Sequence, residues 1–490
     1  MRTNLQACTA CVALLAAAPV SAATYPAVEL ATIAGAVTPT THPFLLTNTA
    51  QATAFVLAAQ NDPSKNMQLL RLATSVKAWV ANPILISSLE TTYSGTDLNT
   101  YLNRFSVVTS GQGGAALFAL SFAYYHFLYS LNIGFGDSAT DAAAAFNARQ
   151  ILYIWAATGF RQNGQVIADY QSFTGTNSDG SEMTPADVWS GVGLQIGRGM
   201  LPFVAAEDIM SAGTFSNHEA IIQNFIVSMR DMLIGAANFH YDSSPYYDCH
   251  RYDNQAATVM TSLLALGWYT GDGALVNSLA GVPGYTSLEW SWPQQVEAQI
   301  YGVGEPARTC NEQTTFYDKY NPITVLGELT DRERNEPYQP FGYPTGSLES
   351  LMQAAHMFKD LGWDGYGFTG PDGQSIKVGI DYYAQYYAAY GSLTPASIPD
   401  TGTIADFAQY AGDAYVPTGG GEDVMGGDGL VWPYAIANTI YPGDDRIVAA
   451  LGQAQALYQQ ELTASFGLVS YLPASKPDIL SLMMQGATAN

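Results

Sequence analysis

The chain has 490 residues, of which 48% are hydrophobic and 12% charged, so it is long enough to build a large buried core. Its 18 Lys and Arg residues stand against 42 Asp and Glu residues, which gives a formal net charge of −24. Such an acidic surface argues against nucleic acid and anionic membranes as partners. The same charge counts against a polyanionic substrate, unless basic residues gather locally in a cleft.

The first 22 residues have the pattern of a secretory signal peptide. Arg2 supplies a short positive region, residues 10–19 are almost wholly apolar, and Val20-Ser21-Ala22 provides a small-residue cleavage site. The apolar run is much shorter than the roughly 20 residues that span a bilayer. We therefore expect cleavage after residue 22 or 23 and a secreted or periplasmic protein with no membrane partner. A single N-terminal anchor is the alternative.

Helical periodicity dominates the mature chain. Apolar residues at three- and four-residue spacings predict helices over residues 48–60, 66–81, 114–130, 138–158, 187–210, 217–235, 254–270, 345–360, 374–390, 404–412, 431–439 and 445–464. Loops rich in Gly, Pro, Asp and Tyr lie between them, at 237–253, 301–321 and 331–346. No long linker divides the chain, so stacked helical hairpins in one all-α domain over residues 23–490 are expected. Short strands, for example near residues 295–303, remain an alternative.

The histidines do not have the spacing of a metal-binding helix. They are His42, His126, His218, His240, His250 and His356. We expect no metal and no cofactor. His126 and His356 lie in apolar helical runs and are expected to pack in the core, whereas His42, in Thr-His-Pro, is expected at the surface or in a turn.

Two other motifs give weak signals. No Gly-x-Ser-x-Gly elbow follows a strand, which leaves acid/base chemistry rather than a serine nucleophile. The glycine-rich stretch 419–429 is acidic and lacks the Lys-Ser/Thr of a phosphate loop, so it predicts a flexible surface loop. A calcium-binding loop is the alternative reading of that stretch.

Three segments rich in polar and aromatic residues form the candidate site. The first, 238–255, ends where a helix is expected to begin, so Asp253 or Asn254 is the expected N-cap. An Asn254 amide that does not cap the helix is available to a cleft. The second segment, 304–320, concentrates positive charge around Arg308.

The third segment, 328–343, places two arginines beside two tyrosines within twelve residues: Arg332, Arg334, Tyr338 and Tyr343. A solvated, salt-bridged loop is the alternative reading. The two cysteines beyond the signal peptide, Cys249 and Cys310, fall in the first and second segments. In an oxidising compartment they predict one disulfide that closes a loop of about 60 residues and stabilises by about 2–4 kcal/mol. Two free buried thiols are the alternative.

Together these segments contain the groups needed for β-elimination of a uronate. A cation or an amide must neutralise the C6 carboxylate so that the C5 proton becomes acidic, a base must remove that proton, and an acid must protonate the departing O4 oxygen. A tyrosine serves as base and acid when neighbouring arginines lower its pKa. The local arginines also offer cationic groups to a polyanionic substrate on an otherwise acidic chain.

Several motifs, most densely between residues 190 and 390, resemble the alginate-lyase superfamily of polysaccharide lyases. Asp253-Asn254-Gln255 opens a helix that ends at Thr270-Gly271-Asp272, as in that family. Further similar positions are Gly197-Arg198 and Ala205-Ala206-Glu207, then Asp331, Arg334, Asn335, Tyr338 and Gly342, and finally Gly379 and Asp381-Tyr382-Tyr383-Ala384 with Tyr386. The resemblance implies an (α/α) toroid, an incomplete barrel of helical hairpins with a cleft across one end.

The resemblance also implies roles. Tyr338 acts as base, acid or both, Asn254 with Arg332 or Arg334 neutralises the carboxylate, and His250 assists or is the base for the opposite epimer. The chain departs from the family in having Asp-Asn-Gln where a His is common, and Tyr338 where many relatives have His. The expected substrate-binding residues are Arg308, Tyr343, His240, Tyr246, Arg251 and Gln255.

The expected activity is therefore cleavage of a β-1,4-linked uronan, such as alginate or glucuronan, and the expected partner is an anionic polysaccharide. One alternative is a glycoside hydrolase of the same toroid plan. It would use two carboxylates among Asp248, Asp253, Asp331 and Glu333, roughly 6.5–9.5 Å apart for inversion. A non-catalytic glycan-binding protein is the other alternative, since one fold hosts several functions.

Overall fold

The computed structural model describes most of the helical core of the chain. The described residues are 41–80, 115–159, 161–162, 165–166, 174–176, 180–184, 193, 196–211, 219–243, 253–305, 325–330, 342–388, 427–453, 455 and 476–485. The predicted signal peptide, residues 1–22, and the predicted helix at 404–412 lie outside these ranges. Their assignments stay predictions.

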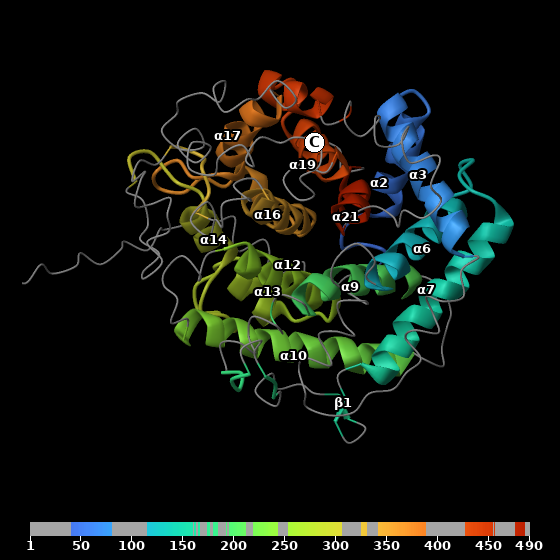
Figure 1. Ribbon diagram of the computed structural model, residues 1–490, viewed down its shortest axis with the longest axis horizontal. Coiled ribbons are helices and arrows are strands. Elements are labelled where there is room, and N and C mark those ends of the chain that lie inside the picture. Colours follow the sequence, from blue (N-terminus) through green and yellow to red (C-terminus); the bar gives the residue numbers. More distant parts are fainter. Residues whose placement is uncertain are drawn as a thin grey trace, which may run out of the picture.

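The described elements are almost all helices (Figure 1). In chain order they are α2 (Thr49–Ala59), α3 (Pro63–Trp79), α6 (Ala115–Ser130), α7 (Ser138–Thr158), α9 (Gly197–Ser211), α10 (Glu219–Ser243), α12 (Asn254–Tyr269), α13 (Gly273–Leu279), α14 (Trp292–Gln299), α16 (Gly342–Asp360), η4 (Gly365–Gly367), α17 (Ile376–Ala388), α19 (Gly427–Ile440) and α21 (Lys476–Met484). A two-stranded antiparallel sheet joins β1 (Arg161–Gln162) to β2 (Gln165–Val166). The predicted all-α fold is confirmed.

Some predicted boundaries are wrong for identifiable reasons. α10 continues to Ser243, although a loop was expected from residue 237, because Ala236 and Ala237 extend its buried apolar face. α13 and α14 were not predicted, since helices of seven and eight residues show too little periodicity. Gly427, expected in a surface loop, begins α19.

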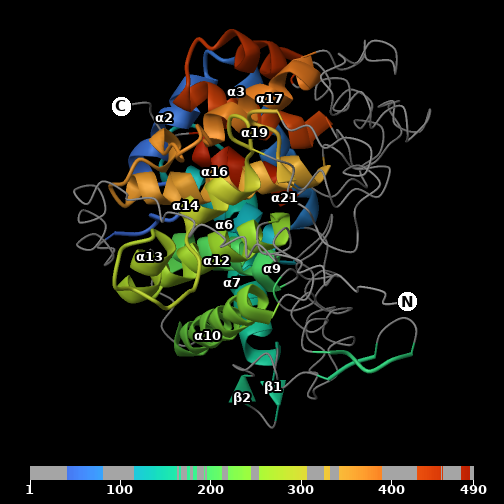
Figure 2. The same ribbon diagram turned by 90° about the vertical axis from the view of Figure 1, so that its left-hand side faces the viewer.

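Five helices form a ring at the centre of the molecule (Figure 1). α9 packs between α6 and α12, α16 packs on the other side of α12, and α21 contacts both α16 and α6. Outer helices cover this ring: α7 packs on α6, α10 packs on α7 and α12, and α14 packs on α16. Figure 2 shows α10 along one edge of the molecule, with β1 and β2 beyond it. This arrangement is the predicted toroid of inner and outer helices.

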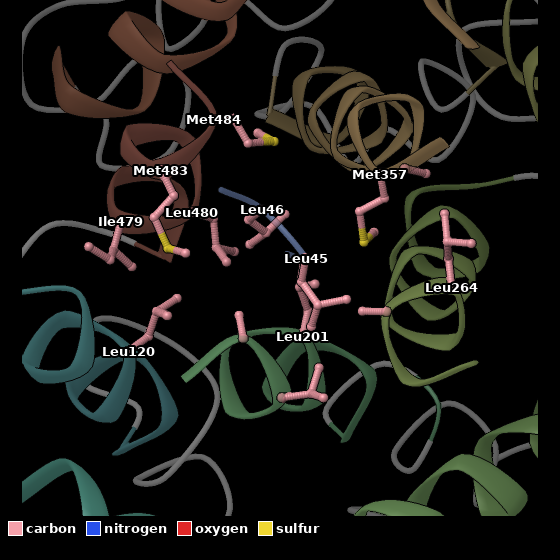
Figure 3. Packing of buried hydrophobic residues seen from close by; sticks show 14 of the residues in the cluster. Leu45, Leu46, Leu120, Leu201, Leu264, Met357, Ile479, Leu480, Met483 and Met484 are labelled. Atoms are coloured by element: carbon pink, nitrogen blue, oxygen red, sulfur yellow. The ribbon is translucent and has the colours of Figure 1, made fainter. Parts of the chain in front are cut away.

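The centre of the ring is filled by the chain segment that precedes α2. Leu45 and Leu46 are fully buried there. Figure 3 shows them surrounded by apolar side chains of the inner helices, among them Leu120, Leu201, Leu264, Met357 and Leu480. The toroid is therefore a packed core with no open channel at this level.

Three inner helices run in the same direction. The Ser262 hydroxyl of α12 donates to the carbonyl of Gly197, at the start of α9, while Ser211 at the end of α9 lies 3.1 Å from the hydroxyl of Tyr269 at the end of α12. The Thr261 hydroxyl donates to the carbonyl of Ser350 at 2.8 Å, in the first half of α16, and farther along the same two helices Leu264 and Met357 both lie beside the central segment (Figure 3). α9, α12 and α16 therefore begin at the same end of the ring.

α10, between Glu219 and Phe239, is the one helix among the described residues that is long and apolar enough to cross a membrane. Its apolar face packs on α7 and α12, and buries Ile226, Met229 and Leu233. We therefore assign α10 to the outer layer of the toroid.

Candidate functional site

The start of α12 is the best-defined part of the candidate site. Asp253 is the N-cap, because its carboxylate accepts a hydrogen bond from the backbone N–H of Ala256 at 2.9 Å. Asn254 is the first residue of the helix and is only 5% exposed. The sequence left the cap open between these two residues, and the structure assigns it to Asp253. The Asn254 amide therefore has no capping role at this end of the ring.

The joint between α12 and α16 holds this end in place. The Thr258 hydroxyl lies 3.2 Å from that of Ser350, and Thr258 also donates to the carbonyl of Asn254 at 2.7 Å. Ser347, one turn earlier in α16, is fully buried. The structure thus brings the positions of Asn254, Gln255 and Tyr343, in the first turn of α16, to one end of two packed helices. Gln255 is half-buried there.

Arg198 is a candidate that the sequence prediction of the site missed. It is the second residue of α9, is half-buried, and lies at the end of the ring where α12 also begins. A signal for it existed, since a chain with only 18 Lys and Arg residues places this one at the start of a helix that the resemblance had already marked. A guanidinium at this position suits recognition of a carboxylate.

Backbone hydrogen bonds hold residues 325–330, which lead into the predicted arginine and tyrosine cluster. The N–H of Tyr301 donates to the carbonyl of Glu328 at 2.8 Å, and the N–H of Gly327 donates to the carbonyl of Tyr301 at 2.9 Å. Gly327 has a φ of +90°, and a Cβ there would lie 2.2 Å from the carbonyl oxygen of Val378. Only glycine fits this turn against α17.

Two tyrosines of α17 complete the anchor of this segment. The hydroxyl of Tyr383 accepts the N–H of Leu329 at 3.2 Å, and the hydroxyl of Tyr382 donates to the buried carboxylate of Glu328 at 3.3 Å. Thr330, the last described residue before residue 331, is 2% exposed. The Tyr382-Tyr383 pair, which the sequence marked only as a fold signal, therefore anchors the chain directly before the predicted catalytic segment.

Most of the predicted site residues lie outside the described residues. These are Tyr246, Cys249, His250, Arg251, Arg308, Cys310, Arg332, Arg334 and Tyr338. His240 lies in α10 and Tyr343 in α16, but their side chains are also outside the description. The roles of all these residues, and the disulfide, stay predictions.

One carboxylate of the hydrolase alternative, that of Asp253, has a structural role. Asp253 is 1% exposed and caps α12, so its carboxylate is committed to the helix start. Asp248, Asp331 and Glu333 lie outside the described residues. Across the described ranges no group of three or more His, Cys, Asp or Glu residues is arranged to hold a metal ion.

The other histidines resolve differently. His356 is 1% exposed, and burial lowers its pKa, as expected for a core histidine. His126, half-buried, pairs with Asp141 at 2.7 Å. His42 is exposed and lies in a bend, as expected, but its ring also pairs at 2.6 Å with the buried carboxylate of Asp208, which lies 166 residues away in the sequence and is therefore invisible to local patterns.

Two residues with perturbed pKa values, Glu207 and Tyr269, lie at the opposite end of the ring. Burial raises the pKa of Glu207 to about 8, although the guanidinium of Arg149 lies 3.1 Å away and acts in the other direction. Burial also raises the pKa of the Tyr269 hydroxyl, which accepts a hydrogen bond from Gln223 at 2.7 Å. These groups form a second polar cluster, distinct from the candidate site.

The chain matches no protein-family model and no curated protein. Among solved structures it is similar to an alginate lyase from Bacteroides ovatus, with 13% sequence identity, coverage of 74% of each chain and a TM-score of 0.38. This likeness is too distant to identify functional residues, so the site rests on its own geometry.

Proposed function

We propose that this protein is a polysaccharide lyase that cleaves a β-1,4-linked uronic-acid polymer, of the alginate or glucuronan type, by β-elimination. The observation that carries the proposal is the position of Asn254. It sits in the first turn of α12, at the end where α9 and α16 also begin, and Asp253 performs the capping. An amide at this place is suited to bind an anionic group.

Three features at this end favour a carboxylate ligand. The backbone N–H groups in the first turns of α9, α12 and α16 contribute partial positive charge, because helix dipoles point their positive ends there. Arg198 adds a full positive charge at the start of α9. The predicted arginines, Arg332 and Arg334, belong to the segment that follows the anchored residue Thr330. These arginines supply the cationic groups that binding of a polyanion requires on a chain with a net charge of −24.

The proposed reaction proceeds in three linked steps. Asn254 and an arginine bind the C6 carboxylate of the uronate and stabilise the negative charge that develops on it. Tyr338, as the phenolate, removes the C5 proton, and electrons from the C5–H bond form the C4=C5 double bond while the C4–O4 bond breaks. The O4 oxygen receives the proton, so the products are a new 4,5-unsaturated end and a new reducing end.

Incubation of the full chain with purified alginate and glucuronan tests this proposal. We expect ultraviolet absorbance from 4,5-unsaturated ends to grow in step with new reducing ends. Reducing ends without that absorbance indicate a hydrolase and refute the lyase. Binding to the polymer without new ends indicates a glycan-binding protein.

The Tyr338→Phe variant tests the role of the tyrosine. We expect kcat to fall by about 100-fold or more, since proton transfer by a positioned side chain contributes about that much. Tyr285→Phe is the matched control, because Tyr285 is 40% exposed in the loop after α13. Equal activity in the two variants removes Tyr338 from the mechanism.

A further inference from the structure

The segment in the centre of the ring has the environment of a bound peptide. Phe44, Leu45, Leu46 and Thr47 are between 0% and 8% exposed, yet the segment is neither helix nor strand. Figure 3 shows its two leucines between α6, α9, α12, α16 and α21. These helices span the chain from Ala115 to Met484, so the surface around the segment is complete only when the whole ring has formed.

One carboxylate of the ring binds the main chain of this segment. Asp208 of α9, which is 1% exposed, accepts the N–H of Phe44 at 2.7 Å and that of Leu45 at 2.9 Å through Oδ2. Its other oxygen, Oδ1, pairs with Nδ1 of His42 at 2.6 Å. Charge-assisted hydrogen bonds of this kind are among the stronger ones in proteins. The two amides are thus held by a side chain of the ring, as in a peptide-recognition site.

Aromatic side chains form a pocket beside this carboxylate. The ring of Phe44 lies 4.9 Å from that of Trp268 and 6.3 Å from that of Tyr269, both at the end of α12. The ring of His42 lies 6.2 Å from that of Tyr269. An aromatic anchor in a pocket, next to a carboxylate that binds two main-chain amides, gives this site side-chain and main-chain specificity together.

We propose that the centre of the ring is a peptide-binding site, and that residues 42–47 occupy it as an internal ligand that docks and leaves as a unit. The ligand class is a short apolar peptide with a histidine two residues before an aromatic residue. The segment leaves without unfolding the ring, because the five helices also pack on one another and on the outer helices. This proposal is independent of the lyase activity.

Hydrogen exchange on the unmodified full chain tests whether the segment moves as a unit. At low urea concentrations we expect the amides of Phe44 and Leu45 to exchange at least about tenfold faster than those of Leu201 and Leu264, with rates that depend less steeply on urea, because release of the segment exposes less surface than unfolding of the ring. Exchange of all four amides at one urea-dependent rate shows that the segment opens only with the ring. That result overturns the proposal.

The Asp208→Asn variant tests the carboxylate. We expect exchange of the Phe44 and Leu45 amides to rise by about tenfold or more, while exchange at Leu201 and Leu264 stays unchanged. Asp231→Asn is the matched control, since Asp231 is an exposed carboxylate on α10 paired with Arg230. An equal rise at all four amides, or no rise, contradicts the assignment of Asp208 as the peptide-binding group.

A synthetic peptide that spans residues 41–48 tests the site directly. In the full-length His42→Ala variant, whose own segment is weakened while Asp208 remains, we expect the labelled peptide to bind at least about tenfold more tightly than in the unmodified chain. A peptide that carries Phe44→Ala is expected not to bind. Equal or absent binding of the two peptides refutes a peptide-binding site.

Discussion

The two ends of the helical ring are built from different kinds of polar residue. Where α9, α12 and α16 begin, the buried polar side chains include an amide and hydroxyls, as in Asn254, Thr258 and Ser350. At the opposite end the polar side chains include ionisable ones, namely the buried Arg149, Glu207 and Asp208, the half-buried Tyr269 and the exposed His42. Perturbed ionisable groups often mark active sites, but here they hold helices and the central segment together. At this end of the toroid, perturbed pKa values therefore accompany structural contacts.

Loss of the buried arginine at the structural end is expected to have the largest effect on stability. Arg149 contacts Glu207 at 3.1 Å, lies 3.8 Å from Glu219, and also donates to the carbonyl of Met210. Arg149→Met leaves the Glu207 carboxyl buried without this partner, so we expect the free energy of unfolding to fall by about 3–5 kcal/mol. Urea titration measures this change.

A matched control and an activity assay test which end of the ring holds the active site. Arg230→Met removes an arginine whose partners, Asp231 and Asp272, are more exposed, and we expect a loss of only about 0–1 kcal/mol. Uronan cleavage by the folded fraction of Arg149→Met is expected to stay normal. Loss of activity in folded Arg149→Met would place the active site at the ionisable end.

At the proposed catalytic end, neighbouring residues are expected to separate activity from stability. Asn254→Ala removes the amide that we assign to the substrate carboxylate, so we expect kcat/KM of the folded protein to fall by roughly 100- to 1000-fold. Asp253→Ala removes the N-cap of α12, so we expect the free energy of unfolding to fall by about 1 kcal/mol. Initial rates and urea titrations of both variants check this. If Asn254 is purely structural, Asn254→Ala loses stability and the folded protein keeps its activity.

The His42–Asp208 pair is expected to make stability depend on pH. The hydrogen bond to Asp208 is the largest cause that raises the pKa of His42 above 6.5, Glu219 acts in the same direction, and burial opposes both. A raised pKa means that the protonated histidine stabilises the folded state. This contribution is complete below about pH 6.5 and is lost as the pH rises through the raised value.

Comparison with His42→Gln isolates this contribution from the other titrating groups that face it. We expect the unmodified chain to be more stable than His42→Gln below about pH 6.5, and the difference to shrink at higher pH. Urea titrations of both proteins over this pH range measure it. His126→Gln is the matched control, because His126 pairs with Asp141 away from the central segment. A difference that grows with pH contradicts the assignment.

The sequence predicted elements whose causes are local. Periodicity located α2, α6, α7 and α12 to within about two residues, and the Thr270-Gly271-Asp272 stop is where α12 ends and α13 begins. The sequence could not locate contacts between distant residues. The pairing of His42 with Asp208, the closure of the ring by α21, and the anchor of Leu329 on Tyr383 all depend on the tertiary fold.

For the candidate site, the sequence assigned Asn254 and Tyr343 to one cleft; the structure places their backbone positions at the starts of α12 and α16, and their roles stay predictions. It did not select Arg198, because nothing local distinguishes a site arginine from a structural one. Arg149, at the buried end of the same group of helices, is the structural counterpart. The two arginines differ in the end of the inner helices at which they lie, and the sequence does not show the direction of these helices.

The smallest expected effect on turnover concerns the anchor before the predicted catalytic segment. Tyr383→Phe removes the hydroxyl that accepts the N–H of Leu329, so we expect a loss of about 1–3 kcal/mol in the free energy of unfolding. Tyr366→Phe is the matched control, because its buried hydroxyl donates to the carbonyl of Met352 at 2.9 Å, within α16. Both variants lose one buried hydrogen bond.

The two variants are expected to differ in turnover. Leu329 and Thr330 precede the segment with Arg332 and Tyr338, so a looser anchor displaces the proposed catalytic groups, whereas Tyr366 braces only the helix. We therefore expect kcat to fall several-fold in Tyr383→Phe, at a nearly unchanged KM, and to stay normal in Tyr366→Phe. Equal kcat values in the two variants, at equal losses of stability, show that the anchor serves the fold alone. A positioning role requires kcat to be lower in Tyr383→Phe than in Tyr366→Phe.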